Sequence, residues 1–293
     1  MYQTVASLLK KCDELNLPIW ELMVRTEMNF ERASRKAVWD KMKHQLHVMQ
    51  KAAKRGASGE GVHSPTGLTG GDAVKMRKYR EQGLGLSGDD VLLAVQNALA
   101  TNEVNAAMGV ICATPTAGSS GTIPGVLFSI KEKLDLTEEQ MIQFLFTASA
   151  FGLVTANSAM IAGAVGGCQA EVGSASAMAA AAAVEVCGGT PKQASEAFAM
   201  ALSNLLGLVC DPVAGLVEIP CVKRNVAGAV NALACSDMAL AGIENKIPAD
   251  EVIGAMRRIG EKMPMQLRET GLGGLATTPT GLKMKIKIFG EEV

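Results

Sequence analysis

The sequence predicts an all-α protein, a compact bundle of helices rich in alanine and glycine around a metal site, with a helical N-terminal arm. Three observations lead to this fold class. Helix-start signals recur along the 293 residues, runs of strictly alternating β-branched residues are nearly absent, and only 4% of the residues are aromatic. Small side chains let helix backbones approach closely, so we expect tight helix packing.

Residues 1–55 are predicted to form the helical arm. Apolar residues at helical spacing run as far as Leu15, and Pro18 ends this first helix. A second helix is expected from Trp20 through Met49. Residues 56–72 combine Gly, Ser, Thr and Pro, which favour turns, and are predicted to form a linker. Residues 73–293 then form the main all-α domain.

Within this domain, local signals predict four helix starts. Acidic residues after Gly88 precede an apolar run, and Thr137 begins a capping box before another. Thr190 combines a cap with a proline at the first helical position, and an amphipathic run begins at Pro248. The best strand-like pattern is the run Lys283–Phe289.

An uncharged stretch, Met141–Ala170, is long enough to span a bilayer. It contains amides, hydroxyls and glycines, and neither an aromatic belt nor a basic flank marks its ends. We therefore expect a buried hairpin of core helices and no membrane contact. The net charge of −1 is spread along the chain, so no nucleic-acid partner is expected either.

The N-terminal residues lack the apolar run of a signal peptide. Seven cysteines without dense spacing do not resemble a secreted disulfide scaffold. These observations favour reduced thiols in a cytoplasmic protein, where cysteines often bind metals or act in catalysis.

Three of these cysteines, Cys168, Cys210 and Cys221, stand in uncharged or glycine-rich surroundings. Their spacing alone also fits buried, inert thiols. Two glycines before Cys168 leave room for a bulky inorganic group, and prolines stiffen the loop between the other two. Three thiolates can hold a metal cluster and leave one metal without a protein ligand, which then acts as a Lewis acid.

A second motif is the hydroxyl-rich segment Thr114–Gly125, which ends where a helix should begin. Backbone N–H groups and hydroxyls at a helix start suit a carboxylate, although an ordinary loop between helices has the same composition. The candidate substrate-binding residues are Asn105, Thr116, Gly118, Ser119 and Ser120.

Other candidates have two interpretations each. Arg224 could neutralise a cluster or bind a substrate carboxylate, and Cys112 precedes the hydroxyl-rich segment closely. His63, beside the glycine-rich linker, is either a solvated residue or a weak candidate base. The remaining cysteines stand at apolar helical positions and are interpreted as packing residues: Cys12, Cys187 and Cys235.

Taken together, the motifs resemble the α chain of iron–sulfur-dependent L-serine dehydratase in its bacterial two-subunit form, from about Ser64 to Ala276. The resemblance is carried by Ser64–Gly71, Asn102–Ala107, Thr114–Thr116, Ile123–Gly125, Gly167–Gly173, Cys210–Gly215, Ile219–Cys221, Arg224–Asn225 and Arg268–Ala276.

This resemblance implies an all-α catalytic domain over residues 73–293 and a [4Fe–4S] cluster held by Cys168, Cys210 and Cys221. It implies deamination of L-serine to pyruvate and ammonia. Single-chain members carry a further domain with a Ser-Ser-Ser-His-Thr motif that this chain lacks, so the base is expected from a separate β chain. Some members end in a cysteine that caps the cluster, whereas this chain ends in Phe289–Val293.

Alternatives remain at this stage. A related cluster-dependent lyase would act on cysteine or threonine. A non-catalytic scaffold subunit would use the same cysteines only structurally or to bind zinc.

Overall fold

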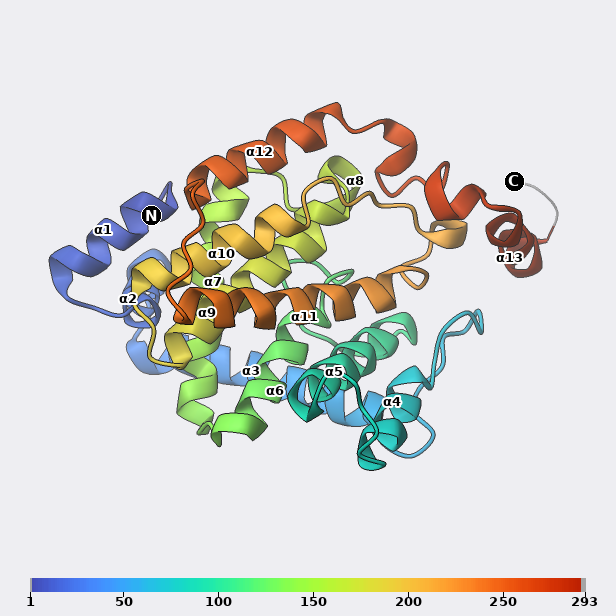
Figure 1. The fold of residues 1–293 in the computed structure, drawn as a ribbon, viewed down its shortest axis with the longest axis horizontal. Helices are drawn as coiled ribbons and strands as arrows, with labels where there is room; N and C mark the ends of the chain where they lie inside the picture. The colour runs from blue at the N-terminus through green and yellow to red at the C-terminus, as the bar shows by residue number, and fades with distance from the viewer. Residues whose placement is uncertain (1, 291–293) are drawn as a thin grey trace.

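The computed structural model describes residues 2–290, which fold into α-helices joined by short 3₁₀ and π turns (Figure 1). The fold class predicted from the sequence is confirmed. The helices are α1 (Val5–Leu15), α2 (Ile19–Glu31), α3 (Arg35–Ala57), α4 (Asp72–Glu81), α5 (Asp89–Ala106), α6 (Thr122–Leu134), α7 (Glu138–Ser158), α8 (Gly163–Gly166), α9 (Ser174–Val186), α10 (Pro191–Asn204), α11 (Cys221–Leu240), α12 (Ala249–Lys262) and α13 (Pro279–Phe289).

Helix α9 lies at the centre of the bundle, between α7, α10 and α11 (Figure 1). Every residue from Ser174 through Val184 is buried, and most of them are alanine. Because the alanine side chain is small, neighbouring helices can pack closely around α9. Alanine also has the highest intrinsic helix propensity. The abundance of small residues in the sequence therefore reflects the centre of the fold.

Two glycines allow α5 and α6 to approach closely. A Cβ atom at Gly125 would lie 3.0 Å from the carbonyl oxygen of Ala94, and one at Gly121 would lie 2.4 Å from that of Ala98. A side chain at either position would force these helices apart. This contact matters for the site because both helices flank the hydroxyl-rich segment Thr114–Gly125.

The uncharged stretch Met141–Ala170 forms most of α7, then α8 and the start of the π turn η1 (Gln169–Gly173). By length and composition α7 could cross a membrane, but 61% of its apolar window is buried within the fold. The helix carries Phe144, Phe146 and Phe151 into the hydrophobic core. It is a core helix of the bundle.

The helix expected from Trp20 through Met49 is interrupted, so this prediction was wrong. The interruption lies at Arg32, whose φ of 52° is left-handed and ends α2. Ser34 then starts α3, because its hydroxyl accepts a hydrogen bond from the N–H of Ala37. The sequence signal for this interruption was Ser34, because serine is a preferred residue at the N-cap of a helix.

The arm shares the main hydrophobic core with the later helices, to which Leu8, Leu22 and Leu46 all contribute. Helix α3 continues through Ala57, two residues into the segment expected to be a linker. The division of the chain into an arm (1–55), a linker (56–72) and a domain (73–293) stays a prediction. Its two ends, Met1 and residues 291–293, lie outside the described residues.

The predicted starts of α5, α7, α10 and α12 are confirmed. Capping boxes are present at Thr137 and at Thr190, the second with Pro191 at the first helical position. The strand-like run Lys283–Phe289 is instead the greater part of helix α13. The hydroxyl of Thr278 starts that helix by accepting from the N–H of Gly281.

Candidate metal centre

The three predicted ligand cysteines come from three separate segments. Cys168 precedes the π turn η1, Cys210 lies in the loop after α10, and Cys221 is the first residue of α11. All three are buried, at 2%, 2% and 6% exposure. The backbone of residues 267–269 holds Cys210 by two hydrogen bonds: the N–H of Cys210 donates to Leu267 (2.8 Å), and its carbonyl accepts from Glu269 (2.7 Å).

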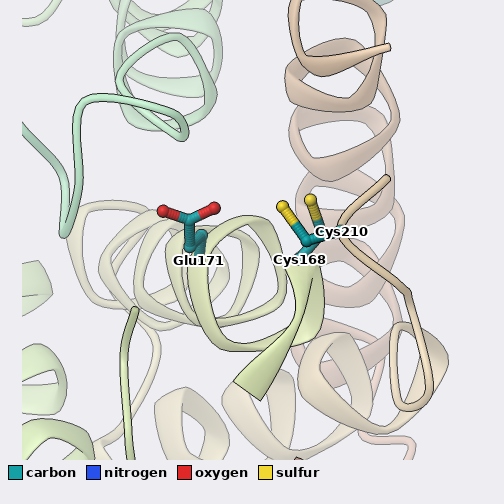
Figure 2. Close-up of side chains that lie close together, drawn as sticks. All are labelled: Cys168, Glu171 and Cys210. Atoms are coloured by element: carbon teal, nitrogen blue, oxygen red, sulfur yellow. The ribbon is translucent and has the colours of Figure 1, made fainter. Parts of the chain in front are cut away.

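A carboxylate, that of Glu171, lies close to two of these thiols. One ligand atom from each of Cys168, Glu171 and Cys210 lies within 4.8 Å of the others, and all three residues are buried. Figure 2 shows the carboxylate and the two sulfurs pointing to the same side of the ribbon. The group could hold a metal ion, since thiolates and carboxylates are metal ligands. Sequence reasoning missed Glu171, although its spacing of three residues from Cys168 predicts a shared helix face.

The buried surroundings shift the protonation of these groups. Burial raises the pKa of Glu171, while the Thr116 hydroxyl, which donates to its carboxylate at 2.7 Å, acts in the opposite direction. A hydrogen bond from Cys210 lowers the pKa of Cys168, assisted by the charge of Arg224. The pKa of Cys210 is raised by the same hydrogen bond, and burial raises that of Cys221. One thiolate is therefore favoured within the Cys168–Cys210 pair.

Arg224 lies one turn after Cys221 on α11 and connects the thiols to a buried acid. Its guanidinium donates to the sulfur of Cys168 at 3.6 Å and to the carbonyl of Val209 at 2.8 Å. It also forms a buried ion pair with Asp211 at 2.8 Å. The other carboxylate oxygen of Asp211 accepts from the N–H of Leu275 at 2.7 Å. Cations beside a thiolate stabilise its charged form.

The hydroxyl-rich segment closes the site on the Glu171 side. Besides the contact from Thr116, the backbone of Gly118 lies against the carboxylate, since a Cβ atom there would come within 3.4 Å of both its oxygens. Ser119 and Ser120 are fully buried. The Ser119 hydroxyl donates to the carbonyl of Thr114 at 2.8 Å and so holds the turn. Thr116 and Gly118 face the carboxylate, whereas the two serines support the turn.

Asparagines from two helices fix this segment. The amide of Asn225 on α11 donates to the carbonyl of Gly118 at 2.7 Å and accepts from the N–H groups of Gly121 and Thr122. Asn102 on α5 donates to the same carbonyl at 3.3 Å. The predicted substrate ligand Asn105 is half-buried in the last turn of α5, and its side chain makes no hydrogen bond within residues 2–290.

His63 lies on the exposed part of the loop formed by residues 58–71. The structure records no contact between this histidine and a cysteine among the described residues. The loop does reach the segment between Cys210 and Cys221, because the hydroxyls of Thr66 and Thr69 donate to the buried Glu218 at 2.8 and 3.0 Å.

The other cysteines lie outside this cluster. Cys12 and Cys235 are buried in the hydrophobic core, as predicted. The prediction for Cys187 was wrong, because this thiol is exposed: it follows the last residue of α9, where the chain leaves the core. Cys112 is half-buried, and its thiol lies 3.8 Å from the carbonyl of Ala113.

Comparison with known proteins places these residues in context. A family model described as serine dehydratase alpha chain matches residues 14–276. A Bacillus subtilis protein named "Probable L-serine dehydratase, alpha chain" is 60% identical over 99% of this chain and 96% of its own length. The L-serine dehydratase alpha chain of Peptoniphilus asaccharolyticus is 41% identical over 97% of both chains.

Longer relatives also match. L-serine dehydratase 2 of Escherichia coli is 37% identical over 94% of this chain, but the match covers only 61% of the relative. The similarity therefore spans nearly all of this chain and leaves more than a third of that longer protein without a counterpart.

Proposed function

This chain belongs to the serine dehydratase alpha chain family, and on that premise we propose that it is the catalytic α subunit of an L-serine dehydratase. It converts L-serine to pyruvate and ammonia with a [4Fe–4S] cluster bound to Cys168, Cys210 and Cys221. The proposal rests on one observation about the arrangement of these side chains. Cys168 and Cys210 form a buried group with Glu171, and Arg224, one turn after Cys221, contacts Cys168.

The residues present fit such a group. Gly163 leaves space beside the thiols, because a Cβ atom there would lie 3.2 Å from the sulfur of Cys210 and 2.5 Å from a carboxylate oxygen of Glu171. The three donors are buried thiols of the kind that hold iron–sulfur clusters. When bound, a cluster held by three thiolates supplies an iron without a protein ligand, which acts as a Lewis acid toward substrate oxygens.

Residues of the chain around this group have distinct roles. Arg224 offsets the negative charge of the thiolates, because its guanidinium already pairs with Asp211 and Cys168. These contacts favour the first of its two interpretations over direct binding of the substrate. Glu171 faces the space beside the thiols and is held by Thr116. It is the side chain of this subunit that we assign to contact the substrate.

We assign the substrate carboxylate to the hydroxyl-rich turn. The backbone N–H groups of Ala117 and Gly118 donate to no acceptor among residues 2–290, and Gly118 lies beside Glu171. Free backbone N–H groups in a turn can bind anions, although these two lie before the first residue of α6, Thr122. Thr116 contributes a hydroxyl to this turn, and Ser119 and Ser120 keep the turn in shape. Asn105 stays a predicted substrate ligand.

The base that removes the α-proton is expected from a β chain, because no histidine of this chain contacts the cysteines within the described residues. In this proposal the enzyme is a heteromer that works in the cytoplasm on a small amino acid, without nucleic acid or membrane contact. His63 is the alternative base within this chain, at the edge of the loop that reaches Glu218.

The experiment that tests the proposal measures iron and sulfide after anaerobic reconstitution. We expect about four irons and four sulfides per chain, with broad absorbance from thiolate-to-iron charge transfer. Serine replacement of Cys168, Cys210 or Cys221 should abolish this absorbance, whereas replacement of the buried Cys12 or Cys235 should leave it intact.

Other outcomes would select the alternatives. One zinc ion and no sulfide would indicate a metal-binding scaffold, for which the Cys168–Glu171–Cys210 group is sufficient. A cluster-loaded enzyme that turns over cysteine or threonine faster than serine would indicate a related lyase. Full iron content in the triple variant of Cys168, Cys210 and Cys221 would refute the ligand assignment.

A further inference from the structure

A cavity lies between α3, α4, α5 and α6, and no described cysteine lines it. Its volume is about 460 Å³, within the range of pockets that hold small organic ligands. Its polar lining residues include Lys54, Arg77, Gln96, Asn97 and Lys131. None of them belongs to the site described above.

Buried amides in this cavity lack hydrogen-bond partners. Gln96 and Asn97, neighbours on α5, are each only 7% exposed, and their side chains make no hydrogen bond within residues 2–290. The Oε1 of Gln96 and the Nε of Arg77 are fully buried without a hydrogen-bond partner among the described residues, whereas the amide nitrogens of Gln96 and Asn97 remain free to donate. A ligand that brings acceptor oxygens into the cavity could therefore accept hydrogen bonds from both amides.

The charges around the cavity favour an anion. Lys54 forms no ion pair with any described residue, and Arg77 reaches an acid, Glu81, only at 3.8 Å. Lys131 pairs with Glu132 at 2.7 Å, and that glutamate is the one acidic residue in the lining. The three cations come from three different helices and outnumber this acid, which leaves an excess of positive charge in the lining.

Apolar side chains complete the walls. Phe128 and Met141 line the cavity together with Ala53 and Ala57. Inorganic anions gain nothing from such a surface, whereas the carbon chain of an organic acid is removed from water there. We propose that this cavity is a binding site for a small organic carboxylate, held by Lys54 and Arg77 at its charged end and by the amides of Gln96 and Asn97.

The position of the cavity relates it to the metal centre through one helix. Gln96 stands six residues before Asn102 on α5, which corresponds to about 9 Å along the helix axis. Asn102 holds the carbonyl of Gly118 in the turn beside Glu171. A carboxylate that orders this part of α5 can therefore influence the turn. The binding itself does not depend on the proposed activity and is measured without turnover.

The test uses isothermal titration calorimetry on the purified full chain with succinate as the probe. Succinamide, which has the same shape without charge, and inorganic phosphate form the comparison arms. We expect saturable binding of succinate, weaker or absent binding of the other two, and a loss of about fivefold in affinity in Lys54→Ala. Gln96→Leu should weaken binding about tenfold, because a buried hydrogen bond to a charged group is lost.

The matched control is Lys51→Ala, which removes an exposed lysine of the same helix that does not line the cavity and should bind as the wild type does. Lys54 is itself exposed, so its variant keeps the fold even where Gln96→Leu does not. The absence of saturable heat with succinate, equal binding of succinamide, tighter binding of phosphate, or unchanged affinity in Lys54→Ala would each overturn the proposal.

Discussion

At the scale of single residues, Glu171 gives the centre a feature that three cysteines alone would lack. Its carboxylate is buried next to two thiols and kept in place by a hydroxyl from a segment 55 residues earlier in the chain. Burial raises its pKa, so the ionised form depends on the hydrogen bonds that surround it. A buried acid with so few partners is more typical of functional sites than of structural ones.

We predict that Glu171→Gln lowers kcat/KM for L-serine about 100-fold or more in the assembled enzyme while iron content is retained. Glutamine keeps the shape of the side chain but carries no negative charge. Thr116→Val should cost about tenfold, because it removes one hydrogen bond to this carboxylate. Steady-state kinetics with parallel iron analysis checks both. Wild-type kinetics in Glu171→Gln would show that the carboxylate only supports the fold.

A second prediction at this scale concerns the ion pair between Arg224 and Asp211. Because the pair is buried, Arg224→Met leaves an uncompensated charge on Asp211 and should lower the free energy of unfolding of the apoprotein by about 3 kcal/mol. The double variant Arg224→Met with Asp211→Asn should recover part of this loss. Urea denaturation of the three variants measures the coupling, and strictly additive losses would contradict it.

At the scale of helices, the sequence predicted where several of them start, among them α5, α7, α10 and α12, but not what their ends contact. The capping boxes at Thr137 and Thr190 are local and could be recognised from residues three apart. The start of α2 has no cap from its own neighbours, since Pro18 precedes it. Its first N–H groups are satisfied instead by Glu185 of α9, at 2.6 Å from Ile19. A cap from 166 residues away leaves no local pattern to read.

This long-range cap gives a pH prediction. Burial raises the pKa of Glu185, against hydrogen bonds from Thr147 and from the N–H groups of Ile19 and Trp20. The folded state therefore holds this proton more tightly than the unfolded chain, so its contribution to stability is complete below the ordinary glutamate pKa of about 4.3 and is lost as pH rises through the raised value.

Glu185→Gln removes that titration and one of the acceptors for α2. We expect the variant to be less stable than the wild type by about 1–2 kcal/mol, with a deficit that shrinks as pH rises from about 4.5 toward 7. Urea denaturation across this range, with the exposed Glu139→Gln as a control, measures it. Parallel stability profiles for wild type and Glu185→Gln would contradict the assignment.

At the scale of the whole molecule, the all-α class and the abundance of alanine-rich helices followed from composition and helix signals, because these depend on local chemistry. The central place of α9 among them is known only from the structure. The grouping of Cys168 with Cys210 was expected from motifs. Glu171 was missed: its spacing indicated a shared face with Cys168, but its approach to Cys210 depends on how a distant loop packs beside the π turn η1. The supporting roles of Ser119 and Ser120 were equally hidden, because a hydroxyl-rich turn has the same sequence whether its hydroxyls face a ligand or the backbone.

The last prediction concerns the partner of the complete enzyme. The longer relatives named L-serine dehydratase match this chain over 60–62% of their length, whereas relatives named alpha chain match over 96–98%. We propose that groups carried by the remaining part of the longer proteins are supplied to this subunit by a second chain. A proton acceptor must lie within hydrogen-bond reach of the substrate for the α-proton to be removed.

We therefore expect the isolated, cluster-loaded α chain to release pyruvate from L-serine at a small fraction of the assembled rate, and addition of the β chain to restore turnover. The loop of residues 58–71 is our candidate for part of the contact, since it joins the exposed His63 to the segment between Cys210 and Cys221 through Glu218. Anaerobic pyruvate release is measured with and without the β chain, and His63→Ala serves as the control for a base within this chain. Full turnover by the isolated α chain would contradict the need for a β chain. If His63→Ala then abolished that turnover, the proton acceptor would be His63 of this chain.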